Sequence, residues 1–263
     1  MALRIATWNI NSVRRRLDGL ARLAAEAKPD VICLQETKVQ NDDFPREAVE
    51  KLGYRHLFIH GMKAYNGLAI LSRKPMTKME SRLCVGREDC RYASAIIDGV
   101  EIHNCYVPAG GDIPDIKLND KFAHKLDFLA ELETWWTARR APKAKAILVG
   151  DLNVAPLETD VWSHKQLLDV VSHTPVEVEH LSRVTKAHDW VDAVRHFIPP
   201  EQKLYSWWSY RNRDWNASDR GRRLDHVWVT PAMKASLKSA KILRDARGWD
   251  DASDHVPVVV EIK

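Results

Sequence analysis

The chain has 263 residues, of which 45% are hydrophobic and 29% are charged. This composition is sufficient for a large buried core and excludes a mainly disordered chain. The formal net charge of +4 is only mildly basic, so charge alone does not identify a polyanionic partner. No run approaches the ~20 apolar residues that a membrane span needs, and the first nine residues hold no stretch of signal-peptide length. We therefore expect a cytoplasmic protein without a membrane-spanning segment.

Secondary structure can be predicted from runs of apolar residues in chain order. Short runs rich in β-branched residues predict strands at 3–8, 31–34, 68–71, 102–107, 146–149, 227–229 and 256–262. Helical spacing predicts helices at 13–27, 47–52, 117–139 and 190–196. Strands and helices alternate without a Gly/Ser-rich or Pro-rich linker, which predicts an α/β fold in one domain covering 1–263.

The four cysteines do not indicate a metal site or a disulfide framework. They are Cys33, Cys84, Cys90 and Cys105, and none belongs to a Cys-x-x-Cys pair. Cys33 and Cys105 lie within strand-like runs and are expected in the core. A reducing compartment is consistent with this pattern.

Polar residues follow several of the predicted strands at the point where each strand ends. They are amides, carboxylates and a phenol: Asn9, Asn11, Glu36, Tyr106, Asp151 and Asn153. Because ligands gather at the carboxyl ends of strands in open sheets, we expect one site there. Asp254 and His255 precede the last strand, and an antiparallel pairing would bring its beginning to the same edge.

These side chains suit a metal-assisted reaction at phosphorus. Glu36, Asp151 and Asp254 supply carboxylate oxygens and no thiolate accompanies them, which favours Mg²⁺ or Mn²⁺. Asp151 and Asn153 are two residues apart, so in extended backbone both point to one face. Hydrolysis of a phosphodiester needs a metal, a base for water and donors for the developing charge. Each residue taken alone has a simpler structural interpretation, and only the set predicts this chemistry.

A basic segment lies at 203–223, where six Lys and Arg residues outnumber two Asp residues. Its concentration of positive charge favours a polyanionic partner. The three consecutive arginines at 14–16 are instead interpreted as a solvated helix face.

Six short motifs, taken together, identify a family resemblance. They are Thr7-Trp8-Asn9, Leu34-Gln35-Glu36-Thr37-Lys38, Tyr106-Val107-Pro108, Gly150-Asp151-Leu152-Asn153, Arg223-Leu224-Asp225 and Ser253-Asp254-His255. In this order they resemble the exonuclease III / AP endonuclease family and cover nearly the whole chain. The resemblance implies a four-layered α/β sandwich with two mixed sheets face to face and helices outside. It also implies a DNA repair enzyme that cuts 5′ to abasic sites and degrades or trims 3′ ends.

The resemblance assigns a role to each matching residue. Glu36, Asn9 and Asp254 are implied to hold the metal, while Asp151 is implied to activate water. Asn153, Tyr106 and His255 are implied to contact the phosphate, and Asp225 to orient His255.

The substrate pocket is implied by the aromatic and basic residues late in the chain. Trp207 and Leu224 match positions of a pocket for a base-free sugar, which flips out most easily where no base pairs. Arg211, Arg213 and Arg222 are expected to contact the DNA, whereas Trp208 is expected in the core. The partner implied is duplex DNA carrying abasic sites or 3′ ends, and the chain is expected to act as a monomer.

Three positions depart from the pattern of the family. Ala109 stands where an amide side chain is more common, Arg222 where Trp or Leu is more common, and Asn11 where some relatives have Asp. Two alternatives stay open on the sequence. One is the same chemistry on RNA or a small phosphoester, and the other is a DNA-binding module without catalytic activity.

Overall fold

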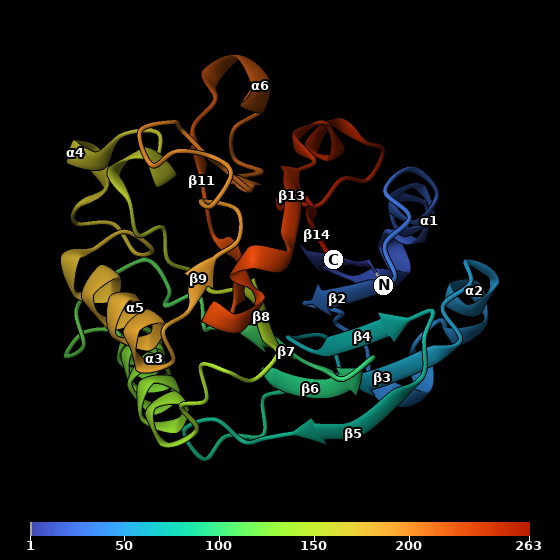
Figure 1. The fold of residues 1–263 in the computed structure, drawn as a ribbon. Coiled ribbons are helices and arrows are strands. Elements are labelled where there is room, and N and C mark those ends of the chain that lie inside the picture. Colours follow the sequence, from blue (N-terminus) through green and yellow to red (C-terminus); the bar gives the residue numbers. More distant parts are fainter. Residues whose placement is uncertain (1) are drawn as a thin grey trace.

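Two six-stranded mixed sheets lie face to face in the computed structural model, which describes residues 2–263 (Figure 1). The first sheet has the order β13-β14-β1-β2-β4-β3 and the second β5-β6-β7-β8-β12-β9. Their strands are β1 Leu3–Asn9, β2 Val31–Gln35, β3 His56–His60, β4 Leu68–Ser72, β5 Met76–Ser81, β6 Tyr92–Ile97, β7 Val100–Tyr106, β8 Ala146–Asp151, β9 Val191–Asp192, β12 Asp225–Val229, β13 Leu237–Ile242 and β14 Val258–Ile262. A separate ribbon pairs β10 Trp207–Trp208 with β11 Gly221–Arg222.

Helices cover the outer faces of both sheets. Figure 1 shows α1 and α2 on one side of the molecule and α3 and α5 on the other. The helices are α1 Leu17–Glu26, α2 Arg46–Lys51, α3 Asp120–Ala138, α4 His164–Leu167, α5 Pro175–Ala187 and α6 Trp215–Ser218. Short 3₁₀ turns occupy Val13–Arg15, Asn41–Asp43, Glu158–Asp160, Pro231–Ser236 and Arg244–Gly248. The structure confirms the predicted α/β sandwich. No helix in the described part of the chain is long and apolar enough to span a membrane.

The core has three apolar layers because neighbouring strand residues face opposite sides. Ile5 belongs to the cluster between the two sheets, whereas Ala6 faces α1. Likewise Ile147 faces the centre and Leu148 packs under α3 and α5. The central strands are buried on both faces, so they appear in the sequence as continuous apolar runs rather than alternating ones.

A buried polar contact joins the sheets immediately below their polar edge. Gln35 Nε2, at the end of β2, donates to Asn104 Oδ1 on β7 at 2.7 Å. Asn104 Nδ2 donates back to the carbonyl oxygens of Leu34 and Ala69 at 3.0 and 3.1 Å. Because unsatisfied buried amides are costly, this contact favours one alignment of the two sheets.

Several predicted elements need correction. The helix predicted at 190–196 is wrong, because Val191 and Asp192 form β9 beside β12 and the Asp192 carboxylate then accepts the backbone N–H groups of Val194 and Arg195. The helix predicted at 13–27 is divided at Arg16, whose φ of −124° is not helical. Helix α5 was not predicted, although Thr174 and Glu177 form a capping box at its start.

The backbone next to the site requires a glycine at position 150. Gly150 has a φ of +141°, and a Cβ placed there would lie 1.9 Å from the carbonyl oxygen of Cys105 on the paired strand. Only glycine allows this approach. The parallel pairing of β7 with β8 therefore continues to Tyr106 and Asp151, which lie opposite each other at the end of the ladder.

We predict that Asn104→Leu lowers the free energy of unfolding by about 1–3 kcal/mol, because Gln35 loses its acceptor on the other sheet and the carbonyl oxygens of Leu34 and Ala69 lose a buried donor. Urea denaturation measures this change. Thr137→Ala, which alters a hydroxyl that bonds only within α3, serves as the control and is expected to stay within about 0.5 kcal/mol of the parent. Equal stability of Asn104→Leu and the parent would show that the contact does not fix the stacking of the sheets.

Candidate active site

The polar ends of the strands open into a cavity of about 750 Å³. Both sheets and the β10–β11 ribbon contribute to its wall. Ten of the predicted residues line it, namely Glu36, Tyr106, Asp151, Asn153, Trp207, Arg211, Arg222, Leu224, Asp254 and His255. Asn9 and Asp225 are completely buried directly behind them, while Arg213 is exposed and outside the lining. The fold thus brings together residues that are up to 219 positions apart in sequence.

One amide group holds two of the carboxylates together. Asn9 Nδ2 donates to Glu36 Oε1 and to Asp151 Oδ2, both at 2.9 Å. Tyr106 also donates its hydroxyl to Glu36 Oε1, at 2.7 Å. Asn9 Oδ1 accepts the backbone N–H of Asn11, so in this arrangement Asn9 acts as a donor to the carboxylates. Asn9 would have to rotate its amide to offer an oxygen to a metal.

Glu36 keeps its negative charge despite its position at the rim. Burial raises its pKa, but the charge of Lys38 and the hydrogen bonds from Asn9, Lys38 and Tyr106 outweigh burial and leave the pKa below the ordinary value. Lys38 Nζ lies 2.8 Å from Glu36 Oε2. The backbone of Glu36 has a φ of 51°, a left-handed conformation that sets the side chain apart from the regular strand.

Asp151 has an environment that favours proton exchange near neutrality. Its pKa is raised to about 7, mainly by burial and also by the charges of Asp225 and Glu36. The charge of His255 and the hydrogen bond from Asn9 act in the opposite direction. Asp151 Oδ1 accepts the backbone N–H of Asn153 at 3.0 Å. A carboxylate with such a pKa is suited to act as a general base.

His255 stands between two carboxylates. Its Nδ1 is 2.8 Å from Asp225 Oδ2, and its Nε2 is 3.6 Å from Asp151 Oδ2. Burial alone would lower its pKa, but Asp225 and Asp151 raise the pKa to about 10, so the ring is cationic at neutral pH. Ser206 Oγ donates to the same Asp225 oxygen at 2.7 Å and accepts the backbone N–H groups of Leu224 and Asp225. Asp225 therefore fixes both the charge and the orientation of His255.

A buried lysine binds the backbone carbonyl of Asn153. Asn153 has a left-handed backbone φ of 53°, and its Nδ2 donates to the Val107 carbonyl at 2.8 Å. Lys125 Nζ, completely buried on α3, donates to the Asn153 carbonyl at 2.7 Å and forms an ion pair with the buried carboxylate of Glu177. Lys125 was not predicted as part of the site, although it lies three residues after Phe122 on the buried side of its helix.

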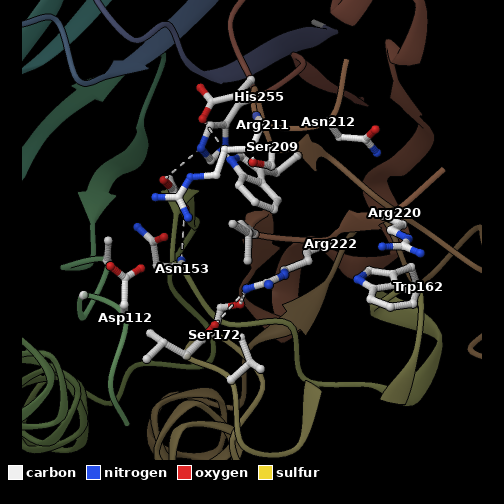
Figure 2. Close-up of a pocket in the computed structure, with 18 of the residues that line it drawn as sticks. Asp112, Asn153, Trp162, Ser172, Ser209, Arg211, Asn212, Arg220, Arg222 and His255 are labelled. Atoms are coloured by element: carbon white, nitrogen blue, oxygen red, sulfur yellow. Dashed lines mark hydrogen bonds and ion pairs between the residues drawn. The ribbon is translucent and has the colours of Figure 1, made fainter. Parts of the chain in front are cut away.

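The outer part of the cavity has an aromatic wall and one internal cation. Trp207 and Leu224 line it as predicted, and Trp162 joins them without having been predicted. Arg222 extends toward Ser172, as Figure 2 shows, with its Nη1 donating to the Val171 carbonyl at 2.8 Å and to Ser172 Oγ at 2.7 Å. Its guanidinium carbon lies 5.3 Å from the Trp207 ring centroid. Trp208 is buried as predicted.

The remaining predicted residues lie around the rim. Asp254 accepts Nε1–H of Trp207 at 3.0 Å and Nδ2–H of Asn11 at 3.0 Å, so it joins the ribbon to the end of β1. Asn11 Oδ1 in turn accepts from Lys38 at 2.6 Å. Ala109 lines the cavity with a methyl group, leaving that part of the wall without a donor side chain. Arg211 is exposed and also lines the cavity.

The donor atoms of the site suit a divalent cation. One carboxylate oxygen from each of Asp151 and Asp225 lies within 4.8 Å of the other and of a His255 ring nitrogen. Because the His255 ring is cationic at neutral pH, the carboxylate oxygens are the donors of this group that a cation would use. Glu36 adds a charged carboxylate that shares the Asn9 amide with Asp151. Clustered hard oxygen donors are the ligands that divalent cations prefer, and all four cysteines are outside the cavity lining.

Comparisons with known proteins agree with this arrangement. Residues 6–255 match the model of the Endonuclease/Exonuclease/phosphatase family. The chain belongs to this family. Within it, the chain is a phosphodiesterase of the exonuclease III / AP endonuclease group, with about 30% identity to members over its full length. The resemblance inferred from the six motifs is confirmed.

Relatives of known structure and sequence cover the whole chain. Exodeoxyribonuclease III of Haemophilus influenzae is 28% identical, with 99% of this chain and 100% of the relative aligned. An AP endonuclease from Archaeoglobus fulgidus has a TM-score of 0.91 and 32% identity, and the match covers 98% of each chain. A 3′ phosphatase from Neisseria, solved with a product DNA hairpin, has a TM-score of 0.91 and 30% identity, and the match covers 99% of each chain.

We predict that Asp225→Asn lowers the pKa of His255 from its value of about 10, because the variant removes the negative charge that raises it while its amide oxygen can still accept Nδ1–H. The ion pair stabilises the fold fully below the ordinary pKa of 6.5, and this stabilisation is lost as pH rises through about 10. NMR titration of the ring resonances measures the shift, with the remote His103 as the internal control. An unchanged His255 titration would show that Asp225 does not set its charge.

Proposed function

We propose that the protein is a divalent-metal-dependent DNA phosphodiesterase that incises 5′ to abasic sites and trims 3′ ends in base excision repair. The observation that carries this proposal is the group of Glu36, Asp151 and His255 at the inner end of a cavity with an aromatic outer wall. The Archaeoglobus relative is an AP endonuclease and the Neisseria relative is a 3′ phosphatase bound to DNA, which supports both activities.

Asp151 is the proposed base that takes a proton from the attacking water. Its raised pKa of about 7 makes it a stronger base than an ordinary carboxylate while leaving a large charged fraction at neutral pH. The cationic His255, fixed by Asp225, would donate Nε2–H to a phosphate oxygen and stabilise the charge that develops on it. Asn153 and Tyr106 would orient the same phosphate through their amide and hydroxyl.

Mg²⁺ is the proposed cofactor, and we expect Mn²⁺ to substitute for it. Glu36 would be its main ligand, with Asn9 and Asp254 as further ligands. Such an ion supplies charge neutralisation and Lewis acidity at the phosphate. Lys38 and the ion would then both contact the Glu36 carboxylate. The hydrogen bond from the Tyr106 hydroxyl would hold that carboxylate in its orientation.

The outer cavity would receive the base-free sugar. Trp207 and Leu224 offer an apolar wall, and an abasic nucleotide leaves the duplex at low cost because it has no base to unpair. Arg211 and Arg213 would contact the DNA backbone outside the cavity, where their exposed side chains add long-range attraction.

Cleavage of two labelled duplexes tests the proposal, each with Mg²⁺ and with EDTA. One carries a single abasic-site analogue and the other is undamaged with a recessed 3′ end. We expect metal-dependent incision at the analogue and slower shortening of the recessed end. If neither duplex is cut, the proposal is wrong. The alternatives would then be an enzyme that acts on RNA or a small phosphoester, or a DNA-binding module without catalytic activity.

We predict that Asp151→Asn abolishes incision while duplex binding stays measurable, because the amide cannot accept a proton yet occupies the same space. Incision is measured by single-turnover kinetics and binding by fluorescence anisotropy. Asp98→Asn, which changes a carboxylate in an exposed turn, is the control and should cut at the parent rate. Incision by Asp151→Asn at close to the parent rate would refute the assignment of Asp151 as the base.

We predict that Arg222→Leu shifts the balance of activities from 3′-phosphate release toward abasic incision by about tenfold, which corresponds to one charged contact of about 1.4 kcal/mol. A terminal phosphate monoester has an extra negative oxygen where a diester carries the next sugar, and Arg222 would attract that oxygen. The ratio of kcat/KM on the two substrates measures the shift, and Arg222→Lys is expected to keep most of the parent ratio. An equal loss on both substrates would show that Arg222 does not select between them.

A further inference from the structure

A second cavity, of about 760 Å³, lies beside the active site. The hydrogen bond from Asn11 Nδ2 to Asp254 Oδ1 joins the linings of the two cavities, because Asn11 lines the second and Asp254 the first. Its lining combines residues near the end of β1 with the segment that precedes the last strand: Asn11, Ser12, Arg15, Arg16, Lys38, Tyr210, Arg247, Gly248, Trp249, Asp251 and Ala252.

The lining carries a net positive charge. Four basic residues face one acidic residue, Asp251. Asp251 forms an ion pair with Arg15 at 3.3 Å, but both side chains are about two-thirds exposed, so this pair is weak. Lys38 is already engaged with Glu36. Arg16 and Arg247 are therefore the two cations that define the character of this cavity.

Arg16 and Arg247 differ from the other buried cations of the protein. Among residues 2–263, four Lys or Arg residues are buried as whole residues. Lys125 is paired with Glu177, and Arg223 with Asp160 and Asp192. Arg16 and Arg247 have no carboxylate within ion-pair distance in the described chain, and both line the same cavity.

Neutral groups of the protein hold these two guanidinium groups in place. Arg16 donates Nη2–H to the Tyr210 hydroxyl at 2.8 Å and to the Ala252 carbonyl at 3.1 Å, and its buried Nε has no partner in the described chain. Arg247 donates Nε–H to the Trp208 carbonyl at 3.3 Å and stacks 5.0 Å from the Tyr210 ring centroid. The interpretation of residues 14–16 as a solvated helix face is thus wrong for Arg16, which is 6% exposed.

Neither guanidinium forms an ion pair within the described chain, and the Asp254 carboxylate acts on Arg247 only from a longer distance, so an anion from outside the chain would complete this arrangement. We propose that the second cavity binds a backbone phosphate of the strand being cut, on the 5′ side of the scissile bond, with Arg247 and Arg16 as its main cationic groups. Guanidinium groups suit this ligand because they offer several N–H donors in a planar arrangement.

The position of the cavity indicates which phosphate it binds. Phosphates follow one another about every 3.4 Å along the axis of each strand, so a strand held at the catalytic centre continues past it in both directions. The active-site cavity takes the sugar on the 3′ side of the scissile phosphate in the proposed function, on which this step rests. The second cavity lies on the other side of the Asn11–Asp254 hydrogen bond. We therefore assign it to a phosphate on the 5′ side of the scissile bond.

Binding of chemically modified duplexes tests the proposal without relying on cleavage. One of the three phosphates on the 5′ side of an abasic analogue is replaced at a time by a neutral methylphosphonate. Affinity of the full chain is measured by fluorescence anisotropy in EDTA. For the parent protein we expect one position at which the replacement weakens binding by about tenfold. For Arg247→Gln we expect the same replacement to change affinity by less than about twofold, because the charge that it removes no longer has a partner.

Two controls make the result specific. Arg247→Lys retains the charge and should retain sensitivity to the same methylphosphonate, and Arg46→Gln, at the distant start of α2, should behave like the parent. The logarithmic salt dependence of binding should fall by about one unit in Arg247→Gln. Full sensitivity of Arg247→Gln at every position, with a normal thermal unfolding curve, would overturn the proposal. Failure of abasic incision would overturn the proposed function alone, because the binding measurement in EDTA detects the phosphate contact without cleavage.

Discussion

The stacking of two sheets is the constraint on which the active site depends, because neither sheet contains the site by itself. Asn9 and Glu36 come from the first sheet, and Tyr106, Asp151 and Asp225 from the second. A sliding of one sheet over the other would separate the Asn9 amide from one of its two carboxylates. The apolar layer between the sheets supplies most of the attraction but does not determine how the sheets are aligned, because the hydrophobic effect is non-directional. The Gln35–Asn104 hydrogen bond is directional and lies next to the site.

The electrostatics of the site follow from the same geometry. Three carboxylates are brought into a buried region, where neighbouring donors and cations compensate them to different degrees. Lys38 and two neutral donors compensate Glu36, His255 forms an ion pair with Asp225, and the pKa of Asp151 is raised by burial and by the charges of Asp225 and Glu36. A division of roles among similar residues thus arises from their surroundings.

The positive charge of the protein is organised around this acidic centre. Arg222 lies within the outer part of the cavity on one side, and Arg16 and Arg247 line the second cavity on the other. An anionic strand passing over the centre would meet cations before and after the carboxylates that repel it. A mildly basic chain is therefore compatible with a polyanionic partner, because the position of a few arginines matters more than the total charge.

The sequence by itself determined the fold class, the family and ten of the residues that meet in the cavity. These properties depend on local apolar patterns and on short motifs at strand ends, which keep their meaning without knowledge of the remote contacts. Tertiary structure decided what each side chain faces. Arg16 in a basic run proved buried, residues 190–196 formed a strand and turns, and Lys125 on an amphipathic helix proved to support Asn153. The burial and charge of a side chain depend on partners distant in sequence, and no local pattern specifies those partners.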